Sequence, residues 1–117
     1  MIRIGILTRS EYEYAAHMRQ GLRVGLTPED VQDILAGPDA PADPVKAALV
    51  RATDEIFGND VVSTATWNEL ARTLNTGQML DVLFAVGGYR SNSILISSAG
   101  VQLDANMADF RFPPELR

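Results

Sequence analysis

Apolar residues recur along most of this chain at the three-to-four-residue spacing of amphipathic helices. Each stripe of this kind predicts a helix that buries one face against a core. The segment from 79 to 96 is apolar on nearly every side, which predicts a central helix wrapped by the others or by neighbouring subunits. The clearest one-sided stripe consists of Val45, Ala48, Leu49, Ala52 and Ile56.

Short polar residues mark the starts of the predicted helices, because their side chains accept hydrogen bonds from free amides of the first turn. At Ser10, a Glu follows three residues later, the spacing of a capping box. Pro28 and Pro44 each follow a capping residue, where proline suits the first helical position. Gly100 is typical of a helix end. The five predicted starts are Ser10, Thr27, Asp43, Ser63 and Thr76.

Three segments lack a clear helical period. Residues 1–7 alternate isoleucine with other residues, which alone is typical of a strand, but an isolated strand has no partner here, so we interpret them as the end of a helix. Residues 37–44 carry three prolines and predict an irregular loop. Residues 101–117 predict an irregular tail, poorly ordered unless it docks on a partner surface. We therefore expect one all-α domain over 1–117, a bundle of about five helices with this tail.

Composition narrows the possible functions. The chain has no cysteine, which excludes disulfides, thiolate metal sites and thiol redox chemistry. Its net charge of −5, with scattered basic residues, argues against a nucleic-acid partner. No apolar stretch reaches the roughly 20 residues that a bilayer requires, and the first residues do not resemble a secretory signal. We expect a cytoplasmic protein without a membrane partner.

One pair of residues has the spacing of an acid–base site. Glu13 precedes His17, the only histidine, by four residues, so in a helix the two side chains lie one turn apart on the same face. A carboxylate that orients an imidazole is the minimum for general acid–base catalysis near neutral pH. Alternatively, Glu13 only completes the Ser10 cap and His17 only packs. A metal site is a weaker alternative, because further ligands would have to come from other subunits.

The same region resembles a known family. The stretch SEYEYAAH at 10–17 is followed by GLTPE at 25–29, AALVRATDE at 47–55, TW at 66–67, VGGYR at 86–90 and AGV at 99–101. Together these segments resemble the carboxymuconolactone decarboxylase and alkylhydroperoxidase D-like family in its cysteine-free branch, over about residues 5 to 104.

The resemblance implies an all-helical fold that assembles as a homo-oligomer, a trimer or hexamer, with sites near subunit contacts. Ser10 and Glu13 stand where the redox branch has its two cysteines, so its peroxidase-reductase chemistry is lost, while His17 is retained. The family's relay glutamate would precede Met1. The chain therefore looks shortened at its N-terminus, and the site is either completed by another subunit or incomplete.

These observations lead to a functional hypothesis: proton transfer on a small organic acid or lactone, with decarboxylation as the reaction type that the resemblance implies. His17 would move the proton, Glu13 would orient it, and no cofactor or metal is required. Arg90 either joins an inter-subunit ion pair, which we favour, or binds a substrate carboxylate together with Tyr89. Tyr14 either contacts the substrate or packs.

Other interpretations remain open at this stage. The chain could be a non-catalytic oligomerising or interaction module that has lost the family's reaction. It could also be a thiol-independent peroxidase, although no electron carrier is visible in the sequence. Trp67 is expected to anchor the core.

Overall fold

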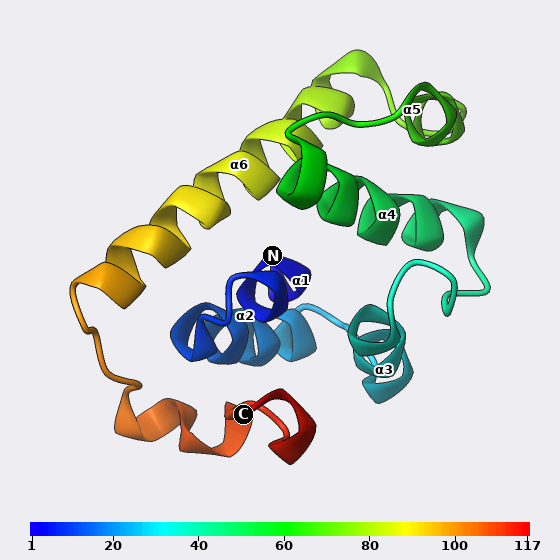
Figure 1. The fold of residues 1–117 in the computed structure, drawn as a ribbon. Coiled ribbons are helices and arrows are strands. Elements are labelled where there is room, and N and C mark those ends of the chain that lie inside the picture. Colours follow the sequence, from blue (N-terminus) through cyan, green and yellow to red (C-terminus); the bar gives the residue numbers. More distant parts are fainter.

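The computed structural model describes residues 1–117 and is all-helical, which confirms the predicted fold class (Figure 1). No helix combines the length and the apolar character needed to cross a bilayer. The elements are α1 (Ile2–Leu7), α2 (Glu11–Arg23), α3 (Pro28–Ala36), α4 (Pro44–Asn59), α5 (Thr64–Ala71), α6 (Thr76–Ser98) and the 3-10 helices η1 (Ala105–Phe110) and η2 (Pro114–Leu116).

The short helix α1 occupies the middle of the molecule and contacts α2, α3, α4 and α6 (Figure 1). The interpretation of its alternating isoleucines as helical is confirmed, because packing of Ile2 and Ile4 outweighs the weak helix preference of so short a segment. Gly5 allows α1 to cross α2 closely: a Cβ added there would lie 2.6 Å from the Tyr14 backbone nitrogen. Tertiary packing therefore decides the conformation of this segment.

Most helix starts lie where the sequence places them. Ser10, Thr27, Asp43 and Ser63 are the N-caps of α2 to α5, and each side chain accepts backbone hydrogen bonds. Helix α6 begins one residue early, with Asn75 as its N-cap. The Asn75 side chain accepts from the Gln78 amide, and the Gln78 side chain accepts from the Asn75 amide, so both first-turn donors are satisfied.

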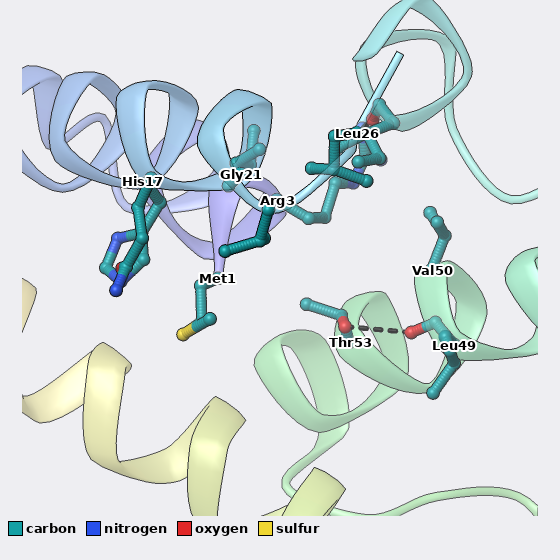
Figure 2. Close-up of a pocket in the computed structure, with 12 residues that line it drawn as sticks. Met1, Arg3, His17, Gly21, Leu26, Leu49, Val50 and Thr53 are labelled. Atoms are coloured by element: carbon teal, nitrogen blue, oxygen red, sulfur yellow. Dashed lines mark hydrogen bonds between the residues drawn. The ribbon is translucent and has the colours of Figure 1, made fainter. Parts of the chain in front are cut away.

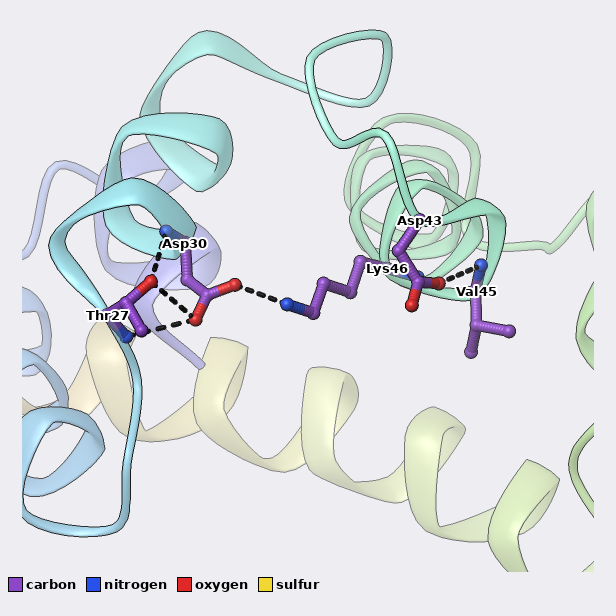
Figure 3. Close-up of polar contacts among 5 residues, drawn as sticks. All are labelled: Thr27, Asp30, Asp43, Val45 and Lys46. Atoms are coloured by element: carbon purple, nitrogen blue, oxygen red, sulfur yellow. Dashed lines mark hydrogen bonds and ion pairs between the residues drawn. The ribbon is translucent and has the colours of Figure 1, made fainter.

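The irregular loop predicted at 37–44 joins α3 to α4, and an ion pair fixes the two helices across it (Figure 3). Asp30 accepts hydrogen bonds from the Thr27 amide and hydroxyl, and its second carboxylate oxygen accepts one from the Lys46 ammonium. These hydrogen bonds lower the pKa of Asp30 to about 2, with the Lys46 bond as the largest cause. The start of α3 is thereby held against the first turn of α4.

Helix α6 does not occupy the central position predicted for it. It runs along one edge of the molecule, and no other helix of this chain covers its outer face (Figure 1). Of the two coverings predicted for it, wrapping by the other helices was wrong, because the short α1 fills the middle. Covering by neighbouring subunits stays a prediction. Its exposed apolar side chains are Leu80 (46% exposed), Phe84 (77%), Ile94 (59%) and Leu95 (65%).

The tail packs on its own chain and contacts α2. Met107 and Phe112 are buried, the Phe112 amide donates to Glu11 Oε1 at 3.2 Å, and the Tyr12 hydroxyl donates to Asp104 Oδ2 at 3.3 Å. The prediction of an irregular tail was right only in part, because η1 and η2 occupy more than half of it. The tail docks on α2 of its own chain. The burial of the apolar side chains Met107 and Phe112 explains why the tail docks there.

Two apolar clusters hold the fold. One consists of Ala48, Ala52, Leu70 and Met79, where α4, α5 and α6 meet, and the other of Ile2, Tyr14 and Phe112, where α1, α2 and the tail meet. Trp67 belongs to neither cluster and is 38% exposed on α5, so the prediction that it anchors the core was wrong. The space between the two clusters contains the candidate site.

Candidate functional site

Glu13 and His17 form a buried pair on α2. His17 Nδ1 lies 3.1 Å from Glu13 Oε2 and 2.8 Å from the Glu13 main-chain oxygen, while Glu13 is 2% and His17 7% exposed. Two acceptors at Nδ1 favour a proton on that nitrogen and leave Nε2 as the acceptor of the neutral ring. The predicted contact between these side chains is confirmed, and both are sheltered from bulk water.

The capping of α2 does not account for the position of the Glu13 carboxylate. The Ser10 hydroxyl accepts from the Glu13 amide at 3.4 Å, which is the ordinary half of the cap. The reciprocal half of a capping box is absent, because the Ser10 amide donates to the Gly5 carbonyl at 2.9 Å and not to the Glu13 carboxylate. The prediction of a capping box at Ser10 was therefore wrong, and the carboxylate is directed toward His17.

Helix α6 supplies two further contacts to the pair. Asn92 Nδ2 donates a hydrogen bond to Glu13 Oε1, so both carboxylate oxygens are engaged. The Tyr89 ring packs against the His17 imidazole in a T-shaped arrangement, with centroids 4.5 Å apart and an interplanar angle of 84°. Tyr89 therefore contacts His17 but is not among the residues that line the cavity, so the predicted role in substrate binding stays a prediction. Asn92 was missed, although it follows Tyr89 by three residues and so lies on a neighbouring part of the helix surface.

The His17 ring lines a partly open cavity of about 380 Å³ between α1, α2, α3 and α4 (Figure 2). Figure 2 shows His17 and Met1 directed toward the same space, with Thr53 approaching from α4. The Thr53 hydroxyl donates to the Leu49 carbonyl at 2.8 Å, which leaves its oxygen as an acceptor. The lining residues are Met1, Ile2, Arg3, His17, Gln20, Gly21, Val24, Leu26, Ile34, Leu49, Val50 and Thr53.

Arg3 contributes a guanidinium to the cavity wall, and this group is already paired. Its Nε and one terminal nitrogen donate to the two Asp54 carboxylate oxygens at 2.7 and 2.8 Å, and its other terminal nitrogen donates to the carbonyls of Ile34 and Leu35. This fork joins α1 to α3 and α4 and fixes one side of the cavity. Arg3 was not predicted as a site residue, although a cation between isoleucines of an apolar segment is a detectable signal in the sequence.

Tyr14 does not lie at the cavity. Its ring packs 4.9 Å from the Phe112 ring, between α2 and the tail, and it is 4% exposed. Burial raises the pKa of its hydroxyl, and the nearby Glu115 carboxylate raises it further. Of the two roles considered for Tyr14, the geometry fits the packing role, because its ring contacts the Phe112 ring and Tyr14 is not among the residues that line the cavity.

Arg90 also lies outside the cavity. Its Nη1 is 2.7 Å from Asp60 Oδ1, and its guanidinium lies 5.1 Å from the centre of the Phe57 ring. Arg90 thus has an ion-pair partner within its own chain, at the C-cap of α4, and the favoured inter-subunit ion pair stays a prediction. Arg90 is not among the residues that line the cavity, so the structure does not bring it together with His17.

The Glu13–His17 pair stands without a third potential metal ligand. No group of three or more His, Cys, Asp and Glu side chains converges in the structure. The polar group that joins the pair is the Asn92 amide, whose nitrogen donates and so acts as a partner of the carboxylate. The arrangement is that of an oriented imidazole beside a small, mainly apolar cavity.

Comparisons with known proteins identify no relative of this chain. No family model matches the sequence, no curated protein matches it, and no solved structure matches the fold. The function is therefore argued from the geometry of the pair and the cavity.

Proposed function

We propose that this protein is a general acid–base catalyst that moves a proton on a small organic acid or lactone bound in the cavity beside His17. One observation carries this proposal: His17 Nδ1 is held by the Glu13 carboxylate and main-chain oxygen while the ring lines the cavity. The proposed base is Nε2, which takes a proton from the carbon next to the substrate carbonyl. The resulting enolate is then reprotonated by the imidazolium.

Glu13 and Tyr89 support this role without touching the substrate. The carboxylate fixes the ring orientation and balances the positive charge that His17 acquires when it takes a proton. Tyr89, which belongs to α6, packs against the His17 ring and limits its rotation. The decarboxylation implied by the sequence resemblance would break a carbon–carbon bond, release carbon dioxide and leave the same enolate for His17 to protonate. We therefore treat proton transfer as the common step.

The test measures proton exchange, which does not require the physiological substrate. A panel of butenolides, with and without a carboxyl group, is incubated with the protein in D₂O, and exchange at the carbon next to the carbonyl is followed by NMR. We expect exchange catalysed by the unsubstituted protein and a loss of about 10²–10⁴-fold in H17Q. The control is R90Q, which lies outside the cavity and should retain the rate. Equal rates for H17Q and the unsubstituted protein, with both folded, would contradict the proposal.

The outer face of α6 favours a second candidate function, an oligomerising module. Gly87 and Gly88 lie at its middle, and a Cβ added at either would meet no atom within 4 Å. A second copy crossing antiparallel at these glycines would set Leu80 against Leu95. The apolar side chains exposed on this face present on the order of 400 Å² per copy, a patch size typical of interaction sites in soluble proteins.

Sedimentation velocity tests this second candidate and distinguishes a dimer from the trimer or hexamer that the resemblance implies. We expect self-association of the unsubstituted protein at micromolar concentration and its loss in F84E. The matched control is V61E, which places the same charge at another exposed apolar position outside α6. A protein that stays monomeric at 100 μM would contradict the oligomer.

A further inference from the structure

Two arginines of α2 have no ion-pair partner within the chain. Six of the 10 basic side chains pair with a carboxylate, and the other four are Arg9, Arg19, Arg23 and Arg117. The chain carries 15 acidic residues, so a shortage of carboxylates is not the reason. Arg19 and Arg23 are four residues apart in α2 and therefore lie one turn apart on the same side of the helix.

The stability of α2 does not account for this pair of arginines. Like charges at this spacing destabilise a helix. Arg23 belongs to the last turn of α2, where a cation suits the helix dipole, but Arg19 lies one turn earlier and gains less from it. Two neighbouring guanidinium groups without carboxylates are therefore better explained by an anion that the protein binds.

Both arginines line one hollow between α2 and the tail. Helix η1 packs beside α2 (Figure 1), and the partly open hollow there has a volume of about 510 Å³. This volume falls within the roughly 300–1,000 Å³ of small-molecule sites. The lining residues are Ala16, Arg19, Gln20 and Arg23 of α2, its C-cap Val24, and Met107 of η1. No acidic residue is among them.

The other two unpaired arginines lie in a different setting. Arg9 and Arg117 line a second hollow, to which Glu11 and Arg111 also belong. The Glu11 carboxylate lies 3.6 Å from the Arg111 guanidinium and accepts a hydrogen bond from a backbone amide of the tail. A negative charge of the chain is thus already present there. The hollow between α2 and η1 differs, because its two guanidinium groups meet no carboxylate of the lining.

The residues of this hollow match a small anion with two negative charges. A guanidinium presents a planar fork of N–H donors that fits phosphate oxygens, and two such groups balance the charge of about −1.5 to −2 of a phosphate monoester near pH 7. The Gln20 amide adds a neutral donor. Val24 is 80% exposed and lies in the same lining as Met107, so an organic group on the phosphate would cover apolar surface.

From this arrangement we infer that the hollow between α2 and η1 binds a small organic phosphate monoester, with the phosphate between Arg19 and Arg23 and the organic group against Val24 and Met107. The net charge of −5 repels a polyanion, which favours a small ester over a nucleic acid or an anionic bilayer. The inference goes beyond the proposed function and does not depend on it, because His17 does not line this hollow.

Three probes test the recognition of the charge and of the organic group. Phenyl phosphate carries two negative charges at pH 7.5, phenyl sulfate has a similar shape with one, and inorganic phosphate lacks the ring. Each is titrated into the ¹⁵N-labelled full chain at constant ionic strength, and dissociation constants are obtained from amide shifts. We expect phenyl phosphate to bind about threefold more tightly than either other probe. Equal binding of either other probe, or no binding of phenyl phosphate up to about 10 mM, would overturn the inference.

The shifted amides show which hollow phenyl phosphate occupies. The question arises because Gln20 and Val24 line both this hollow and the cavity beside His17. We expect shifts at Ala16 and Met107, which line this hollow alone. Shifts centred instead on Thr53, which lines only the cavity beside His17, would overturn the assignment.

Matched arginine substitutions test the charge dependence. R19Q and R23Q each remove one guanidinium and should weaken phenyl phosphate binding by about tenfold, because each removes a hydrogen bond between charged groups. R19K keeps the charge but loses the fork, and its affinity should be intermediate. The control R9Q removes the same charge from the second hollow and should change the affinity by less than about twofold. Equal affinities of folded R19Q and R9Q would overturn the inference, and R19K decides the matter if R19Q fails to fold.

Discussion

The Tyr89 ring stands at 84° to the His17 imidazole with their centroids 4.5 Å apart, so α6 packs directly on the only histidine of the chain. This T-shaped contact joins two helices that are far apart in the sequence. It also restricts the imidazole that the Glu13 carboxylate orients from its own helix. The site therefore depends on the docking of α6 as well as on the i, i+4 spacing within α2.

Replacing Tyr89 should weaken both the fold and the proposed activity. Y89L removes the aromatic contact, which contributes about 0.5–1.5 kcal/mol beyond buried area, and should lower proton exchange by leaving the ring less restricted. Urea unfolding and D₂O exchange measure the two effects. Y89F keeps the ring and should behave like the unsubstituted protein. If Y89L exchanged protons at the full rate, Tyr89 would have no part in positioning His17.

Ser93 provides a prediction about an unsatisfied buried group. It is 1% exposed on α6, and its Oγ has no hydrogen-bond partner. Because an unpaired buried hydroxyl is costly, S93A should raise the free energy of unfolding by about 1 kcal/mol. The exposed Ser91 of the same helix gives the control, since S91A reports the helix-propensity gain alone. An S93A gain no larger than that of S91A would show that the Ser93 hydroxyl is satisfied in solution.

Gly5 should tolerate no side chain. G5A places a Cβ 2.6 Å from the Tyr14 nitrogen and 2.8 Å from its Cα, so α1 must move away from α2. We expect a loss of about 1–3 kcal/mol in the free energy of unfolding, measured with urea. G58A is the control, because a Cβ there meets no atom within 4 Å and alanine favours a helix by about 0.5–1 kcal/mol. Equal stability of the two variants would contradict the close crossing.

The Asp30–Lys46 ion pair predicts a particular pH dependence. The pKa of Asp30 is lowered from 3.8 to about 2, so its contribution to stability is fully present above about pH 4 and is lost as the pH falls through 2. K46M should therefore be less stable than the unsubstituted protein at pH 7, and the difference should vanish near pH 2. Urea unfolding between these values measures it, and E29Q, at an exposed acid of the same turn, should show no such convergence. A difference that is constant with pH would exclude the ion pair as its source.

The sequence predicted the local features of the fold well, because each depends on neighbours in the chain. Caps at Thr27 and Asp43 require a side chain to reach an amide two or three residues on, and the Glu13–His17 contact requires one helical turn. The exceptions are instructive. Ser10 has no reciprocal partner because the Glu13 carboxylate binds Asn92 and His17. The N-cap of α6 is Asn75 and not Thr76, because Gln78 completes a capping box with Asn75.

The candidate site was only half predictable. Asn92 reaches Glu13 across 79 positions of sequence, and Arg3 reaches Asp54 across 51, so no spacing rule could pair them. The roles expected of Arg90 and Tyr14 depended on which way their helices face. Arg90 pairs with Asp60, and Tyr14 packs against Phe112. Each pair is far apart in the sequence and comes together only on folding.

The sequence by itself determined that this protein is helical, free of cysteine chemistry and equipped with one carboxylate–imidazole pair, since periodicity, composition and i, i+4 spacing are properties of the chain alone. Only the tertiary structure decided that α1 lies in the middle, that the tail docks on α2, and that Arg3 at the cavity beside His17 is paired with Asp54. Those features depend on which distant side chains meet when apolar surface is buried, and no local pattern specifies that choice.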